Sequence, residues 1–276
     1  MINCKGKLID LSIPKIMGII NLTPDSFYDG GKNNHINKAL KKTEEYIKQG
    51  ADFIDIGGCS TRPNATTISL KEELDRILPT LKEIKKNFPH TLISIDTFRS
   101  KVAFEAIYHG AHIINDVMGG DFDEAIFQVA SQLKVPYILT HSKGIPRENQ
   151  KEIYNKKEEL ILEINRFFSH KINILKSYGI NDIILDPGFG FGKGPLENFY
   201  LIKNLSFIGF NQYPLLIGIS RKSTIQKILK CTAENALNGS SILHTLALLN
   251  GASILRVHDV KEAKEVILLV KAYQES

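Results

Sequence analysis

Eight short runs rich in β-branched and apolar residues, each followed by a longer segment of helical periodicity, extend along this sequence. The runs that we predict as strands span residues 15–21, 52–57, 91–97, 112–116, 136–141, 182–186, 215–220 and 253–259. Apolar residues recur between them at spacings of three and four, the period of an amphipathic helix. The predicted helices span residues 35–50, 69–87, 99–109, 121–133, 150–178, 195–206, 222–250 with a break, and 259–273. Such near-continuous apolar strands are typical of a parallel sheet covered on both faces.

The number of strand–helix units favours one architecture. Eight units in roughly 250 residues is the content of a closed (β/α)₈ TIM barrel, and a chain of 276 residues with 43% hydrophobic residues can bury a core of that size. A doubly wound open sheet has the same units and stays as the alternative, because strand count does not show closure. No linker or low-complexity tract interrupts the chain. We therefore expect residues 1–276 to form a single α/β barrel domain.

Charge and hydropathy exclude several classes of protein. The net charge is +5, but lysines alternate with glutamates in segments such as 41–49 and 71–86, as on solvated helix faces. We therefore expect an anionic small substrate and no nucleic acid. No run of about 18 apolar residues suggests a membrane span, and the first residues lack the apolar core of a signal peptide. The three cysteines are far apart without a C-x-x-C pair, which favours free thiols and a cytoplasmic location.

Polar residues stand at the C-terminal end of every predicted strand. They are Asn21, Asp55, Asp96, Asn115, Asp116, His141, Asp186, Ser220, Arg221, Lys222, Arg256 and His258. Some of the polar residues near these ends, such as Asp121 and Asp259, are explained as caps of the next helix. Capping explains poorly why Arg256, Lys222 and His258 abut apolar runs, because burying charge is costly unless the charge is used or paired. The C-terminal ends of barrel strands form one face, so the sequence predicts an active site there.

A glycine-rich segment, LDPGFGFGKG at 185–194, follows one of these strand ends. It does not match a phosphate-binding P-loop, because Gly188 and Gly192 are one residue too close and Gly194 stands where a Ser or Thr would hold Mg²⁺. The dinucleotide-binding fingerprint opens the first βαβ unit of a fold, whereas this segment lies late in the chain. The segment therefore predicts a carboxylate, Asp186, beside a loop that lets a ligand approach the backbone.

The strand-end residues suit a flat polar heterocycle. Carboxylates and amides at Asp96, Asn115 and Asp186 can accept paired N–H groups from an aminopyrimidine edge, while Lys222 donates to a carbonyl oxygen.

An anion site is predicted beside the heterocycle site. Arg256 and His258 share one strand face at i and i+2, and together with Arg62 they can hold an anion. Paired histidines of a zinc hydrolase are absent from the first strand, and so is the G-x-S-x-G motif of a serine hydrolase. A Mg²⁺ ion shared with substrate phosphates needs only one or two protein oxygens and fits better.

Seven segments at these strand ends carry a family resemblance. They are MGIINLTPDSFYDGG (17–31), DIGGCSTRP (55–63), SIDT (94–97), GAHIINDV (110–117), LDPGFGFGK (185–193), GISRKS (218–223) and RVHDV (256–260). In this order along the whole chain, they resemble dihydropteroate synthase. One such motif is weak evidence, but seven in register at predicted strand ends are specific.

The resemblance implies a reaction, a metal and an assembly. The family joins 6-hydroxymethyl-7,8-dihydropterin pyrophosphate to p-aminobenzoate, which yields 7,8-dihydropteroate and pyrophosphate for folate biosynthesis. It is a transferase, a sulfonamide target and usually a homodimer of (β/α)₈ barrels, and it works with Mg²⁺. Pyrophosphate leaves before the amine attacks, so no protein nucleophile is needed and catalysis is expected to come from positioning and charge stabilisation.

The same resemblance gives roles to residues of the barrel strands. Asp96, Asn115, Asp186 and Lys222 are expected to hold the pterin, in agreement with the heterocycle argument above. The resemblance also implies that Asn21 binds Mg²⁺ with the pyrophosphate. The remaining residues of this set, which line the pterin site or take the phosphates, are Phe191, Gly218, Arg256 and His258.

Two loops of the family close over the site. One bears Asp25 and Phe27 and the other bears Ser60, Thr61, Arg62 and Pro63. Asp25, Arg62 and Lys222 are the expected catalytic residues, with Arg62 reaching the pyrophosphate. The p-aminobenzoate pocket is expected to be formed by Phe27, Pro63 and Lys222, with Ser223 near the carboxylate. Both loops are rich in proline, glycine and small polar residues, as loops that order over a ligand are.

The sequence departs from the family pattern at four positions. Cys59 stands where many relatives carry glutamate, and Asn64 replaces a glycine. Thr140 and Ser142 flank His141 where relatives often carry methionine, which predicts a more polar wall of the pterin site. Two alternatives to the synthase follow: a pterin-dependent methyltransferase, which has no need of the loop bearing Arg62, and a catalytically silent pterin-binding paralogue.

Overall fold

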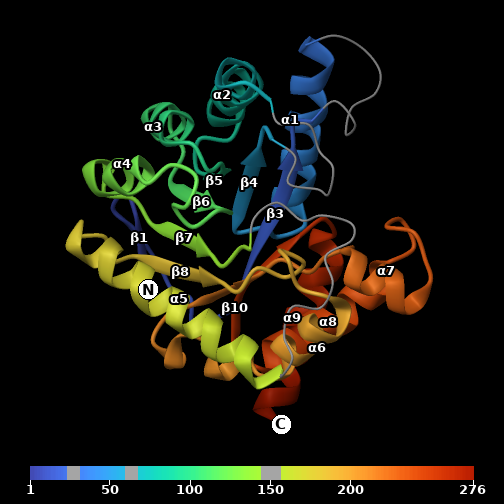
Figure 1. Ribbon diagram of the computed structural model, residues 1–276. Coiled ribbons are helices and arrows are strands. Elements are labelled where there is room, and N and C mark those ends of the chain that lie inside the picture. The colour runs from blue at the N-terminus through green and yellow to red at the C-terminus, as the bar shows by residue number, and fades with distance from the viewer. Residues whose placement is uncertain (24–31, 60–67, 144–156) are drawn as a thin grey trace.

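The computed structural model describes residues 1–23, 32–59, 68–143 and 157–276. Eight parallel strands close into a barrel in the order β10-β3-β4-β5-β6-β7-β8-β9, and helices surround them (Figure 1). The strands are β3 (Lys15–Asn21), β4 (Phe53–Gly57), β5 (Leu92–Asp96), β6 (Ile113–Asp116), β7 (Tyr137–Thr140), β8 (Ile183–Asp186), β9 (Leu215–Ile217) and β10 (Ala252–Val257). The last strand pairs with the first, with Arg256 opposite Met17. The barrel is confirmed, and the open sheet is wrong.

The helices follow the predicted order. They are α1 (Lys32–Lys48), α2 (Leu70–Asn87), α3 (Ser100–Tyr108), α4 (Ala125–Leu133), α5 (Lys157–Ser177), α6 (Pro195–Lys203), α7 (Ser223–Leu229), α8 (Leu237–Leu249) and α9 (Val260–Glu275), with a 3₁₀ segment at Leu205–Asn211. The predicted break in 222–250 is confirmed, because Lys230 ends α7 in the left-handed conformation. The prediction that Asp259 caps α9 is wrong: its carboxylate makes no capping bond and pairs with Arg221 instead. Across the described residues, no helix is both long enough and apolar enough to span a membrane.

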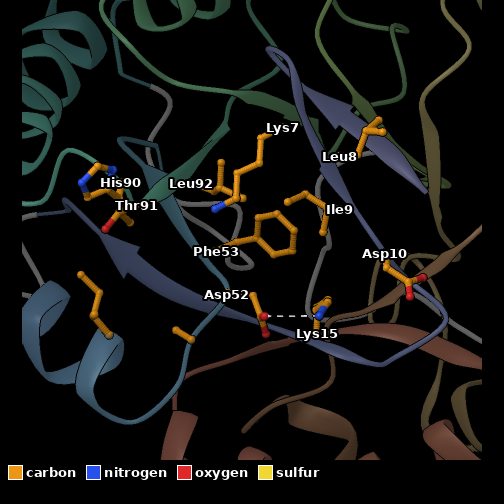
Figure 2. A pocket seen from close by; sticks show the side chains of 12 residues that line it. Lys7, Leu8, Ile9, Asp10, Lys15, Asp52, Phe53, His90, Thr91 and Leu92 are labelled. Carbon is orange, nitrogen blue, oxygen red and sulfur yellow. Dashed lines mark ion pairs between the residues drawn. The ribbon is translucent and has the colours of Figure 1, made fainter.

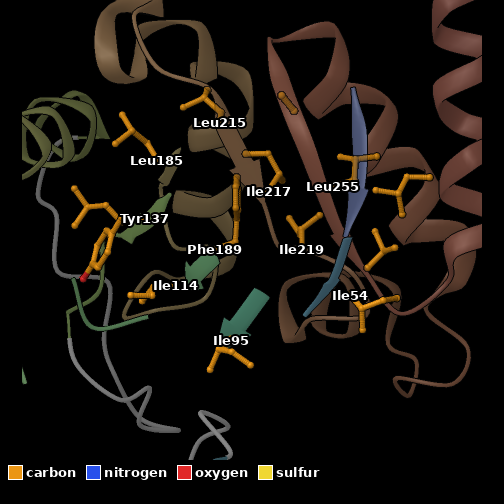
Figure 3. Close-up of a cluster of buried hydrophobic side chains, with 14 of the residues drawn as sticks. Ile54, Ile95, Ile114, Tyr137, Leu185, Phe189, Leu215, Ile217, Ile219 and Leu255 are labelled. Atoms are coloured by element: carbon orange, nitrogen blue, oxygen red, sulfur yellow. The ribbon is translucent and has the colours of Figure 1, made fainter. Parts of the chain in front are cut away.

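Side chains alternate along each strand between two apolar cores. One set points outward and packs against the helices; Figure 3 shows Ile54, Ile95, Ile114 and Leu185 in this layer. The other set points into the barrel and fills its N-terminal half. This inner set consists of Met17, Phe53, Leu92, Ile113, Ile138, Ile184, Leu216 and Ile254. Because side chains alternate at a period of two, the next inward residue of each strand lies one layer closer to the C-terminal end of the barrel.

A hairpin that the sequence did not predict closes the N-terminal end of the barrel. Strands β1 (Ile2–Cys4) and β2 (Lys7–Ile9) pair antiparallel through a two-residue turn, Lys5 and Gly6, with both φ angles positive as in a type I′ turn. The inward side chains of the hairpin belong to the same buried cluster as the inner strand residues. The hairpin therefore covers the N-terminal end of the barrel, and the C-terminal end is left for a ligand.

A surface pocket of about 460 Å³ lies beside this hairpin, at the N-terminal end of the barrel (Figure 2). Phe53 and Leu92 lie beneath it, and Lys15 and Asp52 face each other at 3.7 Å across its edge. The second oxygen of Asp52 accepts the backbone N–H of Ile16, so the charged groups there already have partners. The pocket lies at the opposite end of the barrel from the predicted site and carries none of its residues.

Candidate active site

The inner apolar layer is followed by a polar layer at the C-terminal end of the barrel. On every barrel strand except β3, which carries Ile19, the inward residue two positions after the apolar layer is polar or glycine, as at Asp55, Asn115, Thr140 and Asp186. Parallel pairing aligns these positions, for example Thr140 with Asp186. The expectation that strand-end polar residues meet at one face is therefore met by the structure.

An ionic network crosses the barrel at this layer. The Arg256 guanidinium donates from Nε to Asp55 Oδ2 at 2.6 Å and from Nη2 to Asp96 Oδ2 at 2.5 Å. Asn115 Nδ2 donates to the same Asp55 oxygen at 3.0 Å. Burial raises the pKa of Asp96 to about 7, although Arg256 opposes the shift. Burial alone would lower the pKa of Arg256, but the two carboxylates raise it above its ordinary value, so the arginine is a permanent cation.

This network gives Arg256 partners that the sequence did not predict and adds a residue to the site. In the structure Arg256 holds two buried carboxylates together, and its expected role as an anion ligand beside His258 stays a prediction. Asp55 was noted at a strand end but received no role, and it is the fully buried member of the network. The signal for it was a carboxylate inside the apolar run FIDIG, which is costly unless a cation lies nearby.

A second cluster lies around Asp186 and Lys222. Asp186 Oδ1 accepts the backbone N–H of Gly188 at 2.8 Å, and Lys222 Nζ donates to the carbonyl of Phe189 at 2.5 Å. Burial raises the pKa of Asp186, and the Lys222 charge opposes the shift. Burial lowers the pKa of Lys222 to about 8, and Asp186 opposes that shift in turn. The two groups therefore form a buried, mutually stabilising pair of charges.

Gly218 lies between Lys222 and Arg256. A Cβ at this position would lie 3.9 Å from Lys222 Nζ and 4.0 Å from Arg256 Cδ, in contact with both side chains. The ammonium of Lys222 lies 4.9 Å from the centre of the Phe191 ring. Phe191 packs with Phe98 and Val117 in a small apolar cluster, and its role as a wall of the pterin site stays a prediction.

His258, Ser223 and Asn21 lie around this centre. His258 follows the last residue of β10, and its backbone N–H donates to Ser220 Oγ at 3.3 Å. Burial, with help from the nearby Lys42, lowers the pKa of His258 to about 4, so at neutral pH it offers an uncharged imidazole. Ser223 is the exposed first residue of α7, and Asn21 is the half-buried last residue of β3.

The predicted loop residues lie outside the described residues. They are Asp25, Phe27, Ser60, Thr61, Arg62, Pro63 and Asn64. Cys59 is described and half-buried, and burial raises the pKa of its thiol, with the Glu73 carboxylate acting in the same direction. This direction is opposite to that of a reactive cysteine, whose thiol has a lowered pKa.

The donor set was tested for the expected magnesium ion. In the part of the chain that the structure describes, no group of three or more His, Cys, Asp or Glu side chains is arranged to hold a metal. Asn21 supplies one neutral oxygen at the end of β3. Mg²⁺ prefers oxygen ligands and often binds through one or two protein groups plus substrate phosphates. The residues present therefore fit an ion that arrives with its phosphate ligand.

Within the described ranges, several polar atoms near the C-terminal end of the barrel are buried without a hydrogen-bond partner. They are Asp55 Oδ1, Ser94 Oγ, Asn115 Oδ1, Thr140 Oγ1 and His141 Nδ1. Buried polar atoms in native proteins are nearly always paired, and exceptions gather where a ligand or ordered water completes them. Their concentration at the C-terminal end of the barrel marks this layer as a binding site.

Comparison with known proteins agrees with this geometry. Residues 17–258 match the model of a family described as pterin binding enzyme. Dihydropteroate synthase of Escherichia coli K12 is 40% identical over 97% of this chain and 94% of its own length, and that of a Synechocystis strain is 40% identical over 93% and 89%.

Solved structures give the same result. A Yersinia pestis dihydropteroate synthase with a sulfonamide drug has a TM-score of 0.91 at 39% identity and covers 99% of this chain and 98% of its own. A Xanthomonas albilineans dihydropteroate synthase with 4-aminobenzoic acid has a TM-score of 0.91 at 33% identity, with 100% and 98% covered. The chain belongs to the dihydropteroate synthase family of pterin-binding enzymes.

Proposed function

We propose that the protein is a dihydropteroate synthase, a transferase that joins 6-hydroxymethyl-7,8-dihydropterin pyrophosphate to p-aminobenzoate in folate biosynthesis. The observation that carries the proposal is the buried set of Asp96, Asn115 and Asp186 with Lys222, in a chain that shares its whole barrel with enzymes of that name. Relatives solved with 4-aminobenzoic acid and with 7,8-dihydropteroate support the choice of substrate and product.

Pterin recognition follows from the donors and acceptors of this set. The aminopyrimidine edge of a pterin presents N–H donors that suit a carboxylate, and Asp186 has one oxygen left beyond the bond from Gly188. Asn115 Oδ1 is buried without a partner and is free to accept a further N–H. Lys222 is the cation nearest to Asp186 and would donate to the ring carbonyl, while Phe191 packs against the face of the ring.

The reaction needs positioning more than covalent help. The bond from the pterin methylene to the pyrophosphate oxygen breaks, the amine nitrogen forms a bond to that carbon, and the amine then loses a proton. Pyrophosphate departs with the bonding electrons, so the site has to hold the developing anion. We assign this task to Arg62, Arg256 and His258, with His258 acting as a neutral N–H donor. Water exclusion by the loops that bear Asp25, Phe27 and Pro63 would protect the electron-poor methylene.

Magnesium would complete the anion site. Mg²⁺ bound to the pyrophosphate neutralises part of its charge, and Asn21 would hold the ion from the end of β3. The p-aminobenzoate would lie beyond the pterin methylene, between Lys222 and the loop residues, with Ser223 near its carboxylate. Sulfonamides would compete for that pocket.

We also propose a homodimer in the cytoplasm, and we expect no nucleic acid or membrane partner. Helices α8 and α9 pack together and expose a group of large apolar side chains. They are Ile242, Leu246, Leu249, Leu268, Leu269 and Tyr273, with Leu269 72% exposed. A contiguous apolar surface of this kind is typical of a subunit interface. Sedimentation of the wild type as a dimer and of Leu269→Glu as a monomer would support this surface; a wild-type monomer would refute it.

The deciding experiment measures pyrophosphate release by the purified protein with both substrates and Mg²⁺, omitting each in turn. Release that requires both substrates, with dihydropteroate as the product, establishes the synthase. Folded protein that binds the pterin without release would indicate the silent paralogue instead. An Arg62→Ala protein is expected to bind the pterin normally and turn over much more slowly, and unchanged turnover would refute the role of that loop. A pterin-dependent methyltransferase would also show unchanged turnover after Arg62→Ala.

A further inference from the structure

Lys193, at the end of the glycine-rich segment, is a buried lysine that the proposed reaction does not use. It is only 6% exposed. Its ammonium donates to three main-chain carbonyls, those of Gly188 at 2.9 Å, His141 at 3.3 Å and Phe191 at 3.4 Å. These carbonyls come from two different loops, the one after β7 and the one after β8. The lysine therefore joins two loops through the backbone and not through a carboxylate.

Gly188 connects this lysine to the pterin-binding carboxylate. Its carbonyl accepts from Lys193 Nζ, while its own N–H donates to Asp186 Oδ1 at 2.8 Å. Gly188 has a φ of +71°, and a Cβ there would lie 1.9 Å from the carbonyl oxygen of His141. The loops after β7 and β8 thus touch at backbone level, and there is no room for a side chain at position 188.

We propose that Lys193 is a positioning residue: it holds the Gly188 carbonyl and thereby the backbone of Gly188, so that the Gly188 N–H holds the Asp186 carboxylate in the orientation that binds the pterin. The inference rests on the proposed function, because it concerns the same substrate. Lys193 does not touch the substrate in this scheme and acts through Asp186.

The charge of Lys193 acts in the same direction. Burial lowers its pKa to about 7, and the Asp186 carboxylate opposes that shift. In return, the charge of Lys193 contributes to keeping Asp186 ionised, after the larger contributions from Lys222 and Arg256. The charged and titratable groups that face Lys193 are Asp186, Lys222, Lys143, Glu163 and His141. His141 is neutral at working pH because burial lowers its pKa to about 2.

Replacing Lys193 by methionine tests the proposal, since methionine keeps an unbranched apolar stem and removes all three donations. Calorimetric titration with 6-hydroxymethyl-7,8-dihydropterin pyrophosphate is expected to show roughly 10- to 100-fold weaker binding, the usual effect of losing a charged hydrogen bond. The KM for p-aminobenzoate should change by less than about threefold. Lys85→Met is the matched control. Lys85 also donates to a backbone carbonyl, that of Pro89, but it lies near the C-terminal end of α2. Its pterin affinity should equal that of the wild type.

A double-mutant cycle separates positioning from a merely structural role. If Lys193 acts through Asp186, Lys193→Met should weaken binding by less than about threefold in an Asp186→Asn background. An equal loss in both backgrounds would overturn the proposal. Should Lys193→Met fail to fold, Lys193→Leu removes the same three donations with a shorter apolar side chain, and wild-type affinity in that variant would also overturn the proposal. Failure of the wild type itself to bind the pterin would refute the proposed function, and with it this inference.

Discussion

Replacing Arg256 with glutamine should destabilise the protein strongly, because two buried carboxylates depend on this one guanidinium. Asp55 is fully buried and Asp96 nearly so, and both bond to Arg256 at 2.5–2.6 Å. Removing one partner of a buried ion pair costs about 3–5 kcal/mol, because an uncompensated charge remains. Asp96 can escape part of that cost by protonation, since burial already raises its pKa to about 7. We therefore expect about 3 kcal/mol at pH 6 and more at pH 8.

The size of this effect makes it easy to measure. An unfolding entropy of about 2.1 cal/mol/K per residue gives roughly 0.6 kcal/mol/K for this chain, so 3–5 kcal/mol corresponds to a fall of about 5–9 °C in Tm. Urea unfolding followed by circular dichroism gives the free energy directly. Lys48→Gln is the control: Lys48 pairs with Glu44 at 2.5 Å, but both side chains are at least half exposed. That change should cost no more than about 0.5 kcal/mol.

A compensating substitution sharpens the test. Asp55→Asn in the Arg256→Gln background removes one of the two stranded charges, so the double variant should regain part of the lost stability. The reasoning is refuted if Arg256→Gln unfolds within about 1 kcal/mol of the wild type at pH 8. It is also refuted if the losses of the two single variants add without compensation.

Three further substitutions test other parts of the structure. Gly188→Ala forces a Cβ to 1.9 Å from the His141 carbonyl and should cost at least about 2 kcal/mol in urea unfolding, whereas Gly179→Ala, at φ +78° with open space, should cost about 1 kcal/mol. His244 is buried, and burial lowers its pKa to about 4. Its contribution to stability is therefore complete above pH 6.5 and is lost as pH falls towards 4. His244→Phe should reduce this loss of stability in acid by up to about 3 kcal/mol, as measured by unfolding curves at pH 4–7. Thr140→Val removes a buried hydroxyl without a partner and keeps its shape, so the free protein should be equally or more stable while the pterin binds more weakly; a Tm drop of several degrees would contradict this.

The sequence predicted the strands well because barrel strands carry two signals at once. A run such as LISID is buried along its whole length, and its carboxylate marks the end that faces the ligand. Each predicted strand begins within one residue of the observed one, and the two at 215–220 and 253–259 extend two or three residues too far. Polar residues after a strand look like strand continuation, since loops that return into the site stay buried, as at Ser220.

The N-terminal hairpin escaped prediction for a different reason. Each of its strands has three residues and a half-exposed or charged pattern, too short for periodicity to be distinguished from chance. These residues find packing partners only at the N-terminal end of the closed barrel, because Ile2, Cys4 and Ile9 pack onto its inner apolar layer. The turn signal was present in Lys5 and Gly6, but a lysine at positive φ is uncommon.

Partner choice inside the site could not be read from the sequence either. The residues at strand ends were correctly placed at one face, yet which cation serves which carboxylate depends on distances across the barrel. Arg256 and Asp55 are 201 residues apart in the chain and bond at 2.6 Å. Lys193 received no role from the sequence, whereas in the structure it binds backbone carbonyls. Spacing reveals which groups meet, and three-dimensional geometry decides how they pair.

The charges of the Arg256 network and of the cluster of Asp186, Lys193 and Lys222 balance formally, and that balance separates the two halves of the ligand. The carboxylates are Asp55, Asp96 and Asp186, and the cations are Lys193, Lys222 and Arg256. A neutral pterin ring can enter such a site without leaving a charge unpaired, whereas a pyrophosphate needs additional positive charge, which we assign to Mg²⁺ and Arg62. The affinity for 6-hydroxymethyl-7,8-dihydropterin should therefore be the same with Mg²⁺ or with EDTA, while its pyrophosphate ester should bind at least about tenfold more tightly with Mg²⁺. Equal dependence of both ligands on Mg²⁺ would mean that the metal shapes the pterin site itself, contrary to a balance supplied by these six side chains.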